Sequence, residues 1–349
     1  MISKASFEKE HIKELQMKSH RDPILIERVI YAFGLLEALV KVNLQFIFKG
    51  GTCLMLLLER PRRLSTDIDI IVVPGTDIDT YIKKASEIFP FIFEEEDVRK
   101  RKNNIVKRHF KFTYDSPING KPLYILLDVL FEENHYQAIE ERAIDMEMLL
   151  SEGEPYSVMV PSVDCILADK LTAFAPYTTG IPLRINKDME VMKQLYDVAS
   201  LIDVFSNFRR VSTTYRDISI FEISYRGTNI TPEDCLMDTF ESAACIASRG
   251  AIKPQDYPLY VKAAKDLHDH IFIENFSAEV AATLSPKVMY MALCILQNVP
   301  FSPVEDCREY SNRQIKSELL KPLKSLRKAN PMAYAYVIKA DELYQNIKS

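Results

Sequence analysis

The sequence of 349 residues has no tryptophan, only nine glycines and only six cysteines. No two cysteines form a C-x-x-C pair or cluster with histidine, so neither a zinc site nor a disulfide framework is predicted. No apolar run approaches the roughly 18 residues that a membrane-spanning helix needs. The first ten residues also lack the apolar stretch of a secretory signal. We therefore expect a cytoplasmic protein without a membrane partner.

An excess of positive charge is also missing, because the net charge is −5. Such a balance does not by itself indicate a nucleic-acid-binding protein. One local cluster stands out, directly after four acidic residues at 94–97. It comprises Arg99, Lys100, Arg101, Lys102, Lys107, Arg108 and Lys111. The pattern resembles a hairpin with a basic second half, and two interpretations stay open: a solvated edge, or a surface that follows a phosphate backbone.

The remaining composition is that of an ordinary globular protein, with 47% apolar and 27% charged residues. A chain of this length exceeds the usual single core, so two lobes are expected. Strand-like patterns occupy the first part and fade after Tyr136, where helical periodicity takes over; residues 312–328 are among the predicted helices. We predict an α+β protein, with a small mixed-sheet domain over residues 1–150 and a mostly helical domain over 151–349.

The most informative stretch is residues 46–73, where two apolar strands are joined by a turn and one short helix. The first strand runs into Gly50, Gly51 and Thr52, and the second opens with Asp67 and Asp69. Two carboxylates two residues apart on a strand point to the same face of the sheet. The spacing therefore predicts a pair of acids that face the same partner.

A third acid, Asp128, lies in the middle of an otherwise apolar strand at 124–131. The strand that carries Asp67 and Asp69 is equally apolar, so we expect all three acids to be buried. An isolated buried charge is costly unless it is paired or holds a metal. Three acids in hydrophobic strands therefore predict a bound cation.

This combination resembles the nucleotidyltransferase superfamily, in which a Gly-Gly or Gly-Ser turn and a short helix precede Asp-x-Asp. It is more closely similar to the bacterial AbiEii/AbiGii-type nucleotidyltransferase toxins. The similarity is carried by three blocks, at residues 48–54 with 63–70, at 169–174 and at 193–198. Members of that family commonly carry Arg-Asp where this chain has Lys193 and Gln194.

The resemblance implies an enzyme that transfers NMP from an NTP with the help of two Mg²⁺ ions. Asp67, Asp69 and Asp128 are the expected metal ligands, and Asp128 the expected proton acceptor. The expected nucleotide-binding residues are Gly50, Gly51, Thr52, Arg63, Ser65 and Lys170. From the helical lobe, Lys170 is expected to contact the triphosphate, and Asp197 to position Lys170 or the nucleotide. The helical pattern alone places Lys170 on an exposed face, and pairs Asp197 with Lys193 one turn earlier.

The resemblance also implies a toxin of a toxin–antitoxin or abortive-infection system, with a cognate antitoxin as partner. Some family members add nucleotides to the 3′ end of tRNA, so the resemblance also suggests tRNA as the acceptor of the NMP. Two alternatives stay open. One is a nucleotidyltransferase that modifies a protein or a small-molecule hydroxyl, and the other is a catalytically silent binding module of the same fold. The six histidines show no metal-binding spacing and receive no role.

Overall fold

The computed structural model describes the chain except for residues 98–105, 228, 272–273 and 349. The chain divides into two compact units. The first comprises Met1–Ser162 and Asp269–Glu274, and the second Val163–His268 and Asn275–Ser349. The division therefore lies at Ser162, whereas the sequence pattern suggested residue 150.

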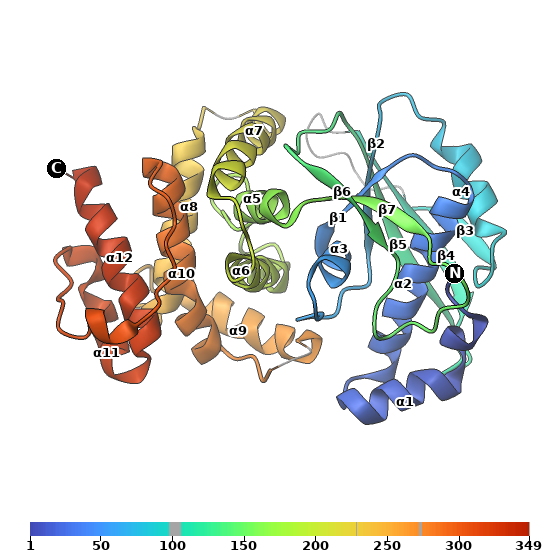
Figure 1. Cartoon of the computed structure of the whole chain (residues 1–349), viewed down its shortest axis with the longest axis horizontal. Coiled ribbons are helices and arrows are strands. Elements are labelled where there is room, and N and C mark those ends of the chain that lie inside the picture. The colour runs from blue at the N-terminus through green and yellow to red at the C-terminus, as the bar shows by residue number, and fades with distance from the viewer. Residues whose placement is uncertain (98–105, 228, 272–273, 349) are drawn as a thin grey trace. The chain divides into compact units, whose positions relative to one another are not determined.

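The fold is α+β, as the sequence predicted: the first unit contains a mixed sheet and the second is mostly helical (Figure 1). The sheet has seven strands in the order β3-β4-β5-β2-β1-β7-β6. The pairs β2–β5 and β1–β7 are parallel and the others antiparallel. The strands are β1 (Ile47–Lys49), β2 (Ile68–Val72), β3 (Phe93–Glu96), β4 (Lys107–Asp115), β5 (Pro122–Phe131), β6 (Ile139–Ala143) and β7 (Ser157–Pro161).

Strands β6 and β7 correct the prediction that strands end near Tyr136. Strand β6 lies at the edge of the sheet, pairs with β7 and carries the polar run Glu140, Glu141 and Arg142. On this strand Arg142 donates to the Glu140 carboxylate at 2.8 Å. Edge strands commonly carry charged residues, and this weakens the alternating apolar pattern that marks a strand in a sequence.

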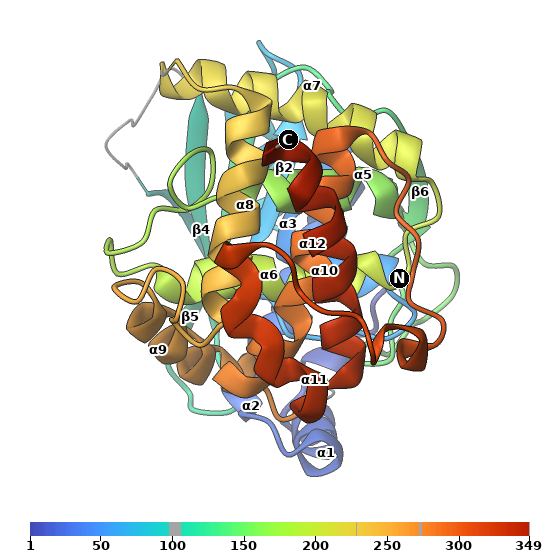
Figure 2. The same cartoon turned by 90° about the vertical axis from the view of Figure 1, so that its left-hand side faces the viewer.

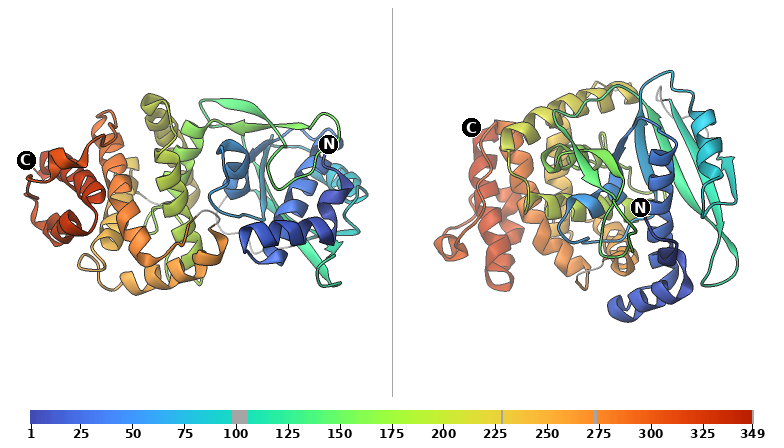
Figure 3. Two further views of the ribbon diagram at one scale, coloured as in Figure 1. Left: turned by 60° about the horizontal axis from the view of Figure 1, so that its bottom comes forward. Right: turned by 45° about the vertical axis from the view of Figure 1, so that its right-hand side comes forward.

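Helix α2 packs on one face of the sheet (Figure 3). It begins at Pro23, and the Asp22 side chain caps it by accepting the N–H of Ile24 at 2.8 Å. Tyr31 of this helix stacks on Tyr114 of β4. The helices of the first unit are η1 (Lys4–Phe7), α1 (Lys9–Ser19), α2 (Pro23–Lys41), α3 (Gly50–Leu57) and α4 (Ile78–Ser86).

The second unit is built around α10 (Ala278–Gln297), which contacts α6, α8 and α12 (Figure 2). This helix is long and apolar enough to cross a membrane, but 67% of its most apolar window is buried inside the protein, which is typical of a core helix. The other helices are α5 (Val163–Ala173), α6 (Asp188–Ile202), α7 (Phe208–Arg226), α8 (Pro232–Ala247), α9 (Tyr257–Leu267) and α12 (Pro331–Lys348).

The predicted helix at 312–328 is wrong in type. The chain instead forms the 3₁₀ helix η4 (Glu318–Ser325) and the short α11 (Leu326–Ala329), after a 3₁₀ turn η3 (Cys307–Tyr310). Leu320, Leu323 and Leu326 are all buried and lie three residues apart. In a 3₁₀ helix, with three residues per turn, this spacing places the leucines on one side.

Candidate active site

A row of four polar side chains crosses the middle of the sheet. Lys49 of β1 pairs with Asp69 of β2, Asp69 with Asp128 of β5, and Asp128 with His109 of β4. Residues paired across neighbouring strands point to the same face of a sheet. The fold therefore brings together the Asp69 and Asp128 carboxylates on adjacent strands, whose axes lie about 4.8 Å apart.

The Gly-Gly turn lies directly against this row. A Cβ atom on Gly50 would lie 2.1 Å from Oδ2 of Asp69, and the backbone of Gly50 has a φ of +81°. A Cβ atom on Gly51 would lie 2.5 Å from Nη2 of Arg63 and 2.8 Å from Oγ of Ser65. Only glycine leaves room for these side chains, so the turn, Asp69, Arg63 and Ser65 form one cluster.

One side-chain hydrogen bond and one backbone bridge hold the cluster in place. The buried Thr52 donates its hydroxyl to the carbonyl oxygen of Asp67 at 2.6 Å, which ties α3 to the start of β2. The segment at 269–274 joins the first unit here, because Arg63 forms a β-bridge with Ile271. Arg63 itself is buried, so its position beside Gly51 is well defined.

The expectation that the three acids are buried is wrong. Asp67 is exposed, and Asp69 and Asp128 are half-buried. The apolar neighbours Ile68 and Ile70 are buried because alternate residues of a strand point to opposite faces, which leaves the acids on the more open face. The energetic cost of burying the carboxylates therefore does not by itself require a cation here. A bound cation is instead indicated by the way in which the carboxylates are grouped.

His109 is the residue that the sequence analysis missed. Its Nδ1 lies 2.7 Å from Oδ1 of Asp128, and its side chain is 16% exposed. The signal was present in the hairpin that joins β4 and β5. Because the turn is centred between Ile118 and Asn119, the antiparallel register places residue 109 opposite residue 128.

Carboxylate oxygens are the ligands that Mg²⁺ prefers, and Asp69 and Asp128 supply them from adjacent positions. Within the described part of the chain, no three His, Cys, Asp or Glu side chains are grouped so as to hold a metal by themselves. Mg²⁺ is commonly held by one or two carboxylates together with substrate phosphates and water. The grouping fits such a shared site better than an all-protein cage.

The remaining predicted residues, Lys170 and Asp197, pair with each other in the second unit. Nζ of Lys170 lies 3.0 Å from Oδ2 of Asp197, and the two side chains are 8% and 2% exposed. The expectation of an exposed Lys170 is therefore wrong. Lys193, the alternative partner of Asp197, instead contacts Glu190 at 2.8 Å. That this pair acts together with the cluster of the first unit stays a prediction.

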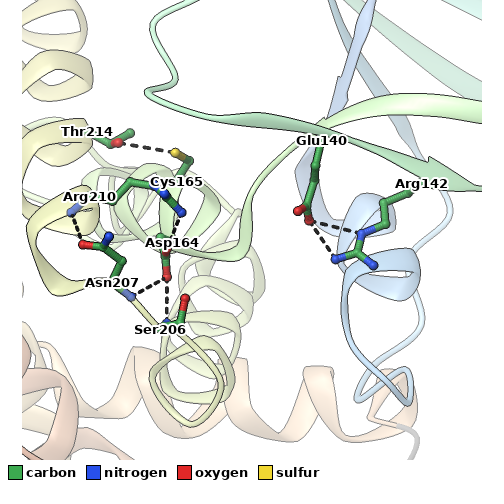
Figure 4. A network of polar contacts seen from close by, with 8 residues as sticks. All are labelled: Glu140, Arg142, Asp164, Cys165, Ser206, Asn207, Arg210 and Thr214. Carbon is green, nitrogen blue, oxygen red and sulfur yellow. Dashed lines mark hydrogen bonds and ion pairs between the residues drawn. The ribbon is translucent and has the colours of Figure 1, made fainter.

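The helix that carries Lys170 is anchored at its N-terminal end (Figure 4). Asp164 of α5 accepts the N–H groups of Ser206 and Asn207 at 2.8 and 3.2 Å, and the guanidinium of Arg210 at 3.0 Å. Asn207 caps α7 in turn, by accepting the N–H of Arg210. These contacts fix α5 against the start of α7, and so fix the position of Lys170.

In the described part of the basic hairpin, Arg108 and Lys111 are paired with acids, and Lys107 is exposed. Residues 98–105, and with them Arg99 to Lys102, lie outside the described residues. On β4, Arg108 contacts Asp79 at 2.7 Å and Glu96 at 2.8 Å, and it lowers the pKa of both carboxyl groups. Lys111 lies 3.6 Å from both Glu95 and Asp97. Neither Arg108 nor Lys111 therefore offers an unpaired charge to a phosphate backbone.

Comparisons with known proteins add the following. The sequence matches the family described as nucleotidyl transferase AbiEii toxin, type IV TA system, over residues 34–285, which is more than half of the chain. No curated protein matches. Among solved structures, JHP933 from Helicobacter pylori matches at 13% identity, covering 78% of this chain and 94% of that one, with a TM-score of 0.44. A protein of H. pylori assigned to the nucleotidyltransferases matches at 14% identity, covering 78% and 96%, with a TM-score of 0.43.

Proposed function

The chain belongs to the AbiEii family of nucleotidyl transferase toxins from type IV toxin–antitoxin systems, and on this premise we propose that it transfers NMP from an NTP to the 3′ end of tRNA. Family membership makes it a nucleotidyltransferase toxin and implies an antitoxin partner. The observation that carries the proposed site is the adjacent register of Asp69 and Asp128, with Gly50 packed against Asp69.

In this proposal Asp67, Asp69 and Asp128 would hold Mg²⁺, which when bound neutralises phosphate charge and lowers the pKa of the acceptor hydroxyl. His109 orients Asp128 by contacting its Oδ1, so Oδ2 is the oxygen that we assign to accept the proton of that hydroxyl. The assignment explains why a histidine lies in the row.

The turn at Gly50 and Gly51 receives the phosphates of the NTP. Helix α3 begins at Gly50, and the unpaired N–H groups at a helix start attract anions. The guanidinium of Arg63 lies against Gly51 and adds positive charge there, while Ser65 contributes a hydroxyl. These groups balance the charge that develops on the departing pyrophosphate.

Lys170 is assigned to the β- and γ-phosphates of the NTP, and Asp197 is assigned to orient Lys170. The support is their buried ion pair, which restricts the flexible lysine side chain to one direction. A restricted ammonium group loses less conformational entropy when it binds a phosphate.

A test of the function combines each α-labelled NTP with Mg²⁺ and bulk bacterial tRNA. We expect label on tRNA, removed by cleavage at the 3′ terminus. Asp69→Asn and Asp128→Asn should each abolish labelling and leave the protein folded, because both side chains are half-exposed. Asp145→Asn is the matched control, since Asp145 is exposed in the same unit and distant in sequence from the cluster.

Labelling at near wild-type rates by either site variant would refute the site. Label on a polypeptide or a small molecule, and never on tRNA, would refute the acceptor but keep the transferase. Transfer to a protein or a small molecule is one of the two alternatives that the sequence left open. The other, a catalytically silent binding module, would give no label on any acceptor. The Asp145→Asn control must label tRNA at the wild-type rate, so that a loss in the Asp69 or Asp128 variant can be attributed to the site.

A further inference from the structure

In the second unit, η4 and α11 lie beside α12 (Figure 2). A group of exposed basic side chains lies along η4, α11 and the residues just before them. We call it the basic stripe. It consists of Lys316, Lys321, Lys324, Arg327 and Lys328, all exposed. Glu318 is the one acidic residue between Arg313 and Asn330 in the sequence, and it contacts Lys321. Lys316, Lys324 and Lys328 have no ion-pair partner among the described residues.

The 3₁₀ geometry aligns this charge. Lys321, Lys324 and Arg327 each follow one of the three buried leucines by one residue, so they recur every three residues on the outer face. In a 3₁₀ helix residues three apart eclipse each other, with a rise of about 2.0 Å per residue. Within η4, Lys321 and Lys324 are therefore stacked along the axis about 6 Å apart at the level of the backbone, and Arg327 continues the stripe in α11.

The stripe is held firmly on the unit beneath it. Asp341 of α12 is 1% exposed, and its carboxylate accepts the N–H groups of Lys316 and Ser317 at 2.7 and 2.9 Å. The hydroxyl of Tyr334 donates to the carbonyl oxygen of Arg313 at 2.8 Å. With the three leucines buried as well, the backbone of the stripe is fixed before any partner arrives, so binding does not have to order it.

We propose that the basic stripe binds the phosphate backbone of the RNA acceptor. The inference rests on the proposed function, and it leaves the hypothesis about the hairpin untested, because Arg99 to Lys102 lie outside the described residues. Arg108 and Lys111 of that hairpin are engaged by acids, whereas three lysines of the stripe have no paired charge among the described residues. In a chain of net charge −5, such an unneutralised surface is where a polyanion is attracted.

The composition of the stripe favours RNA over an anionic membrane. A membrane-binding surface combines basic residues with large apolar side chains that insert between the lipids. Residues 300–331 are all described, and none of their large hydrophobic side chains is exposed; Val299 and Met332, just outside this range, are the nearest exposed ones in the sequence. Phosphate contacts of a nucleic acid need only the charges, and these the stripe supplies.

The test uses the triple variant Lys316→Gln, Lys324→Gln, Lys328→Gln. Its matched control is Lys9→Gln, Lys13→Gln, Lys18→Gln on α1, which removes the same charge from exposed lysines of the other unit. Binding of fluorescently labelled bulk tRNA is measured by anisotropy over a salt series, without NTP. Each phosphate contact contributes about 0.7–0.9 to the slope of log K against log salt. The stripe variant should reduce the magnitude of that slope by about 2–3 and weaken the affinity about tenfold. Its circular dichroism spectrum should be unchanged.

The control variant, and a stripe variant with arginine in place of the three lysines, should both bind like the wild type. Equal salt slopes for the wild type and the glutamine variant would overturn the proposal, and so would an equal loss in the α1 control. A further arm measures binding to phosphatidylcholine–phosphatidylserine vesicles. If the stripe variant loses vesicle binding but keeps tRNA binding, the surface is a membrane site and the proposal fails.

The labelling assay separates this inference from the proposed function. Stripe-dependent tRNA binding without label from any NTP would refute the transfer and leave the RNA surface standing. Label on tRNA with an unaltered salt slope in the stripe variant would refute the surface and leave the transfer standing.

Discussion

The buried ion pair between Lys170 and Asp197 allows a quantitative prediction. Replacement of Lys170 by alanine deprives the Asp197 carboxylate, which is 2% exposed, of the ammonium group 3.0 Å away. Removal of one partner from a buried pair typically costs about 3–5 kcal/mol, because the other charge stays desolvated. For a unit of this size, 1 kcal/mol corresponds to about 2–4 °C in Tm. We therefore expect Lys170→Ala to lower the Tm of the second unit by about 6–20 °C.

Thermal unfolding followed by circular dichroism measures this effect, and two further variants make it specific. Lys193→Ala on the same helix as Asp197 removes a partly exposed pair with Glu190, for which about 0.3–0.5 kcal/mol is expected. The double variant Lys170→Met with Asp197→Leu removes both charges and should recover much of the stability, since apolar replacements of a buried pair are often neutral. A Lys170→Ala variant that melts within 2 °C of the wild type would refute the burial argument.

Two other substitutions test the first unit. Gly50→Ala should reduce nucleotide transfer more than tenfold, because its Cβ would lie 2.1 Å from Oδ2 of Asp69. Gly75→Ala is the control and should stay active, because Gly75 has a similar φ of +90° and no atom lies within 4 Å of the added Cβ. Equal activity of the two variants would show that the close approach of Gly50 to Asp69 is unimportant. Burial raises the pKa of Glu27, whose carboxylate accepts a hydrogen bond from the hydroxyl of Ser116. The folded state therefore favours the protonated acid. The protein loses stability as the pH rises from the ordinary pKa of a glutamate to the raised pKa in the folded state. Glu27→Gln should therefore gain in Tm over the wild type between pH 4.5 and 8, and a difference in Tm that does not grow with pH would contradict this.

The sequence by itself determined the α+β class, the helix start at Asp22 and Pro23, and the glycine turn that precedes the strand of Asp69. These features depend on residues close together in the chain. A glycine with positive φ is marked by its residue type, and a helix start is marked by Asp-Pro. The turn and the strand after it are joined by one short helix, which leaves few ways to place Gly50 other than against that strand.

Only the tertiary structure decided which residues are neighbours across strands and between helices. It paired His109 with Asp128 and Lys170 with Asp197, it neutralised Arg108, and it placed the acids on the more open face. Register and helix packing set these contacts, and a periodic pattern read along one element does not contain them. The same holds for η4, where three leucines at a spacing of three are compatible with an α-helix until the packing beneath them is known. A charge in the sequence therefore acquired its role from the partner that the fold brought to it.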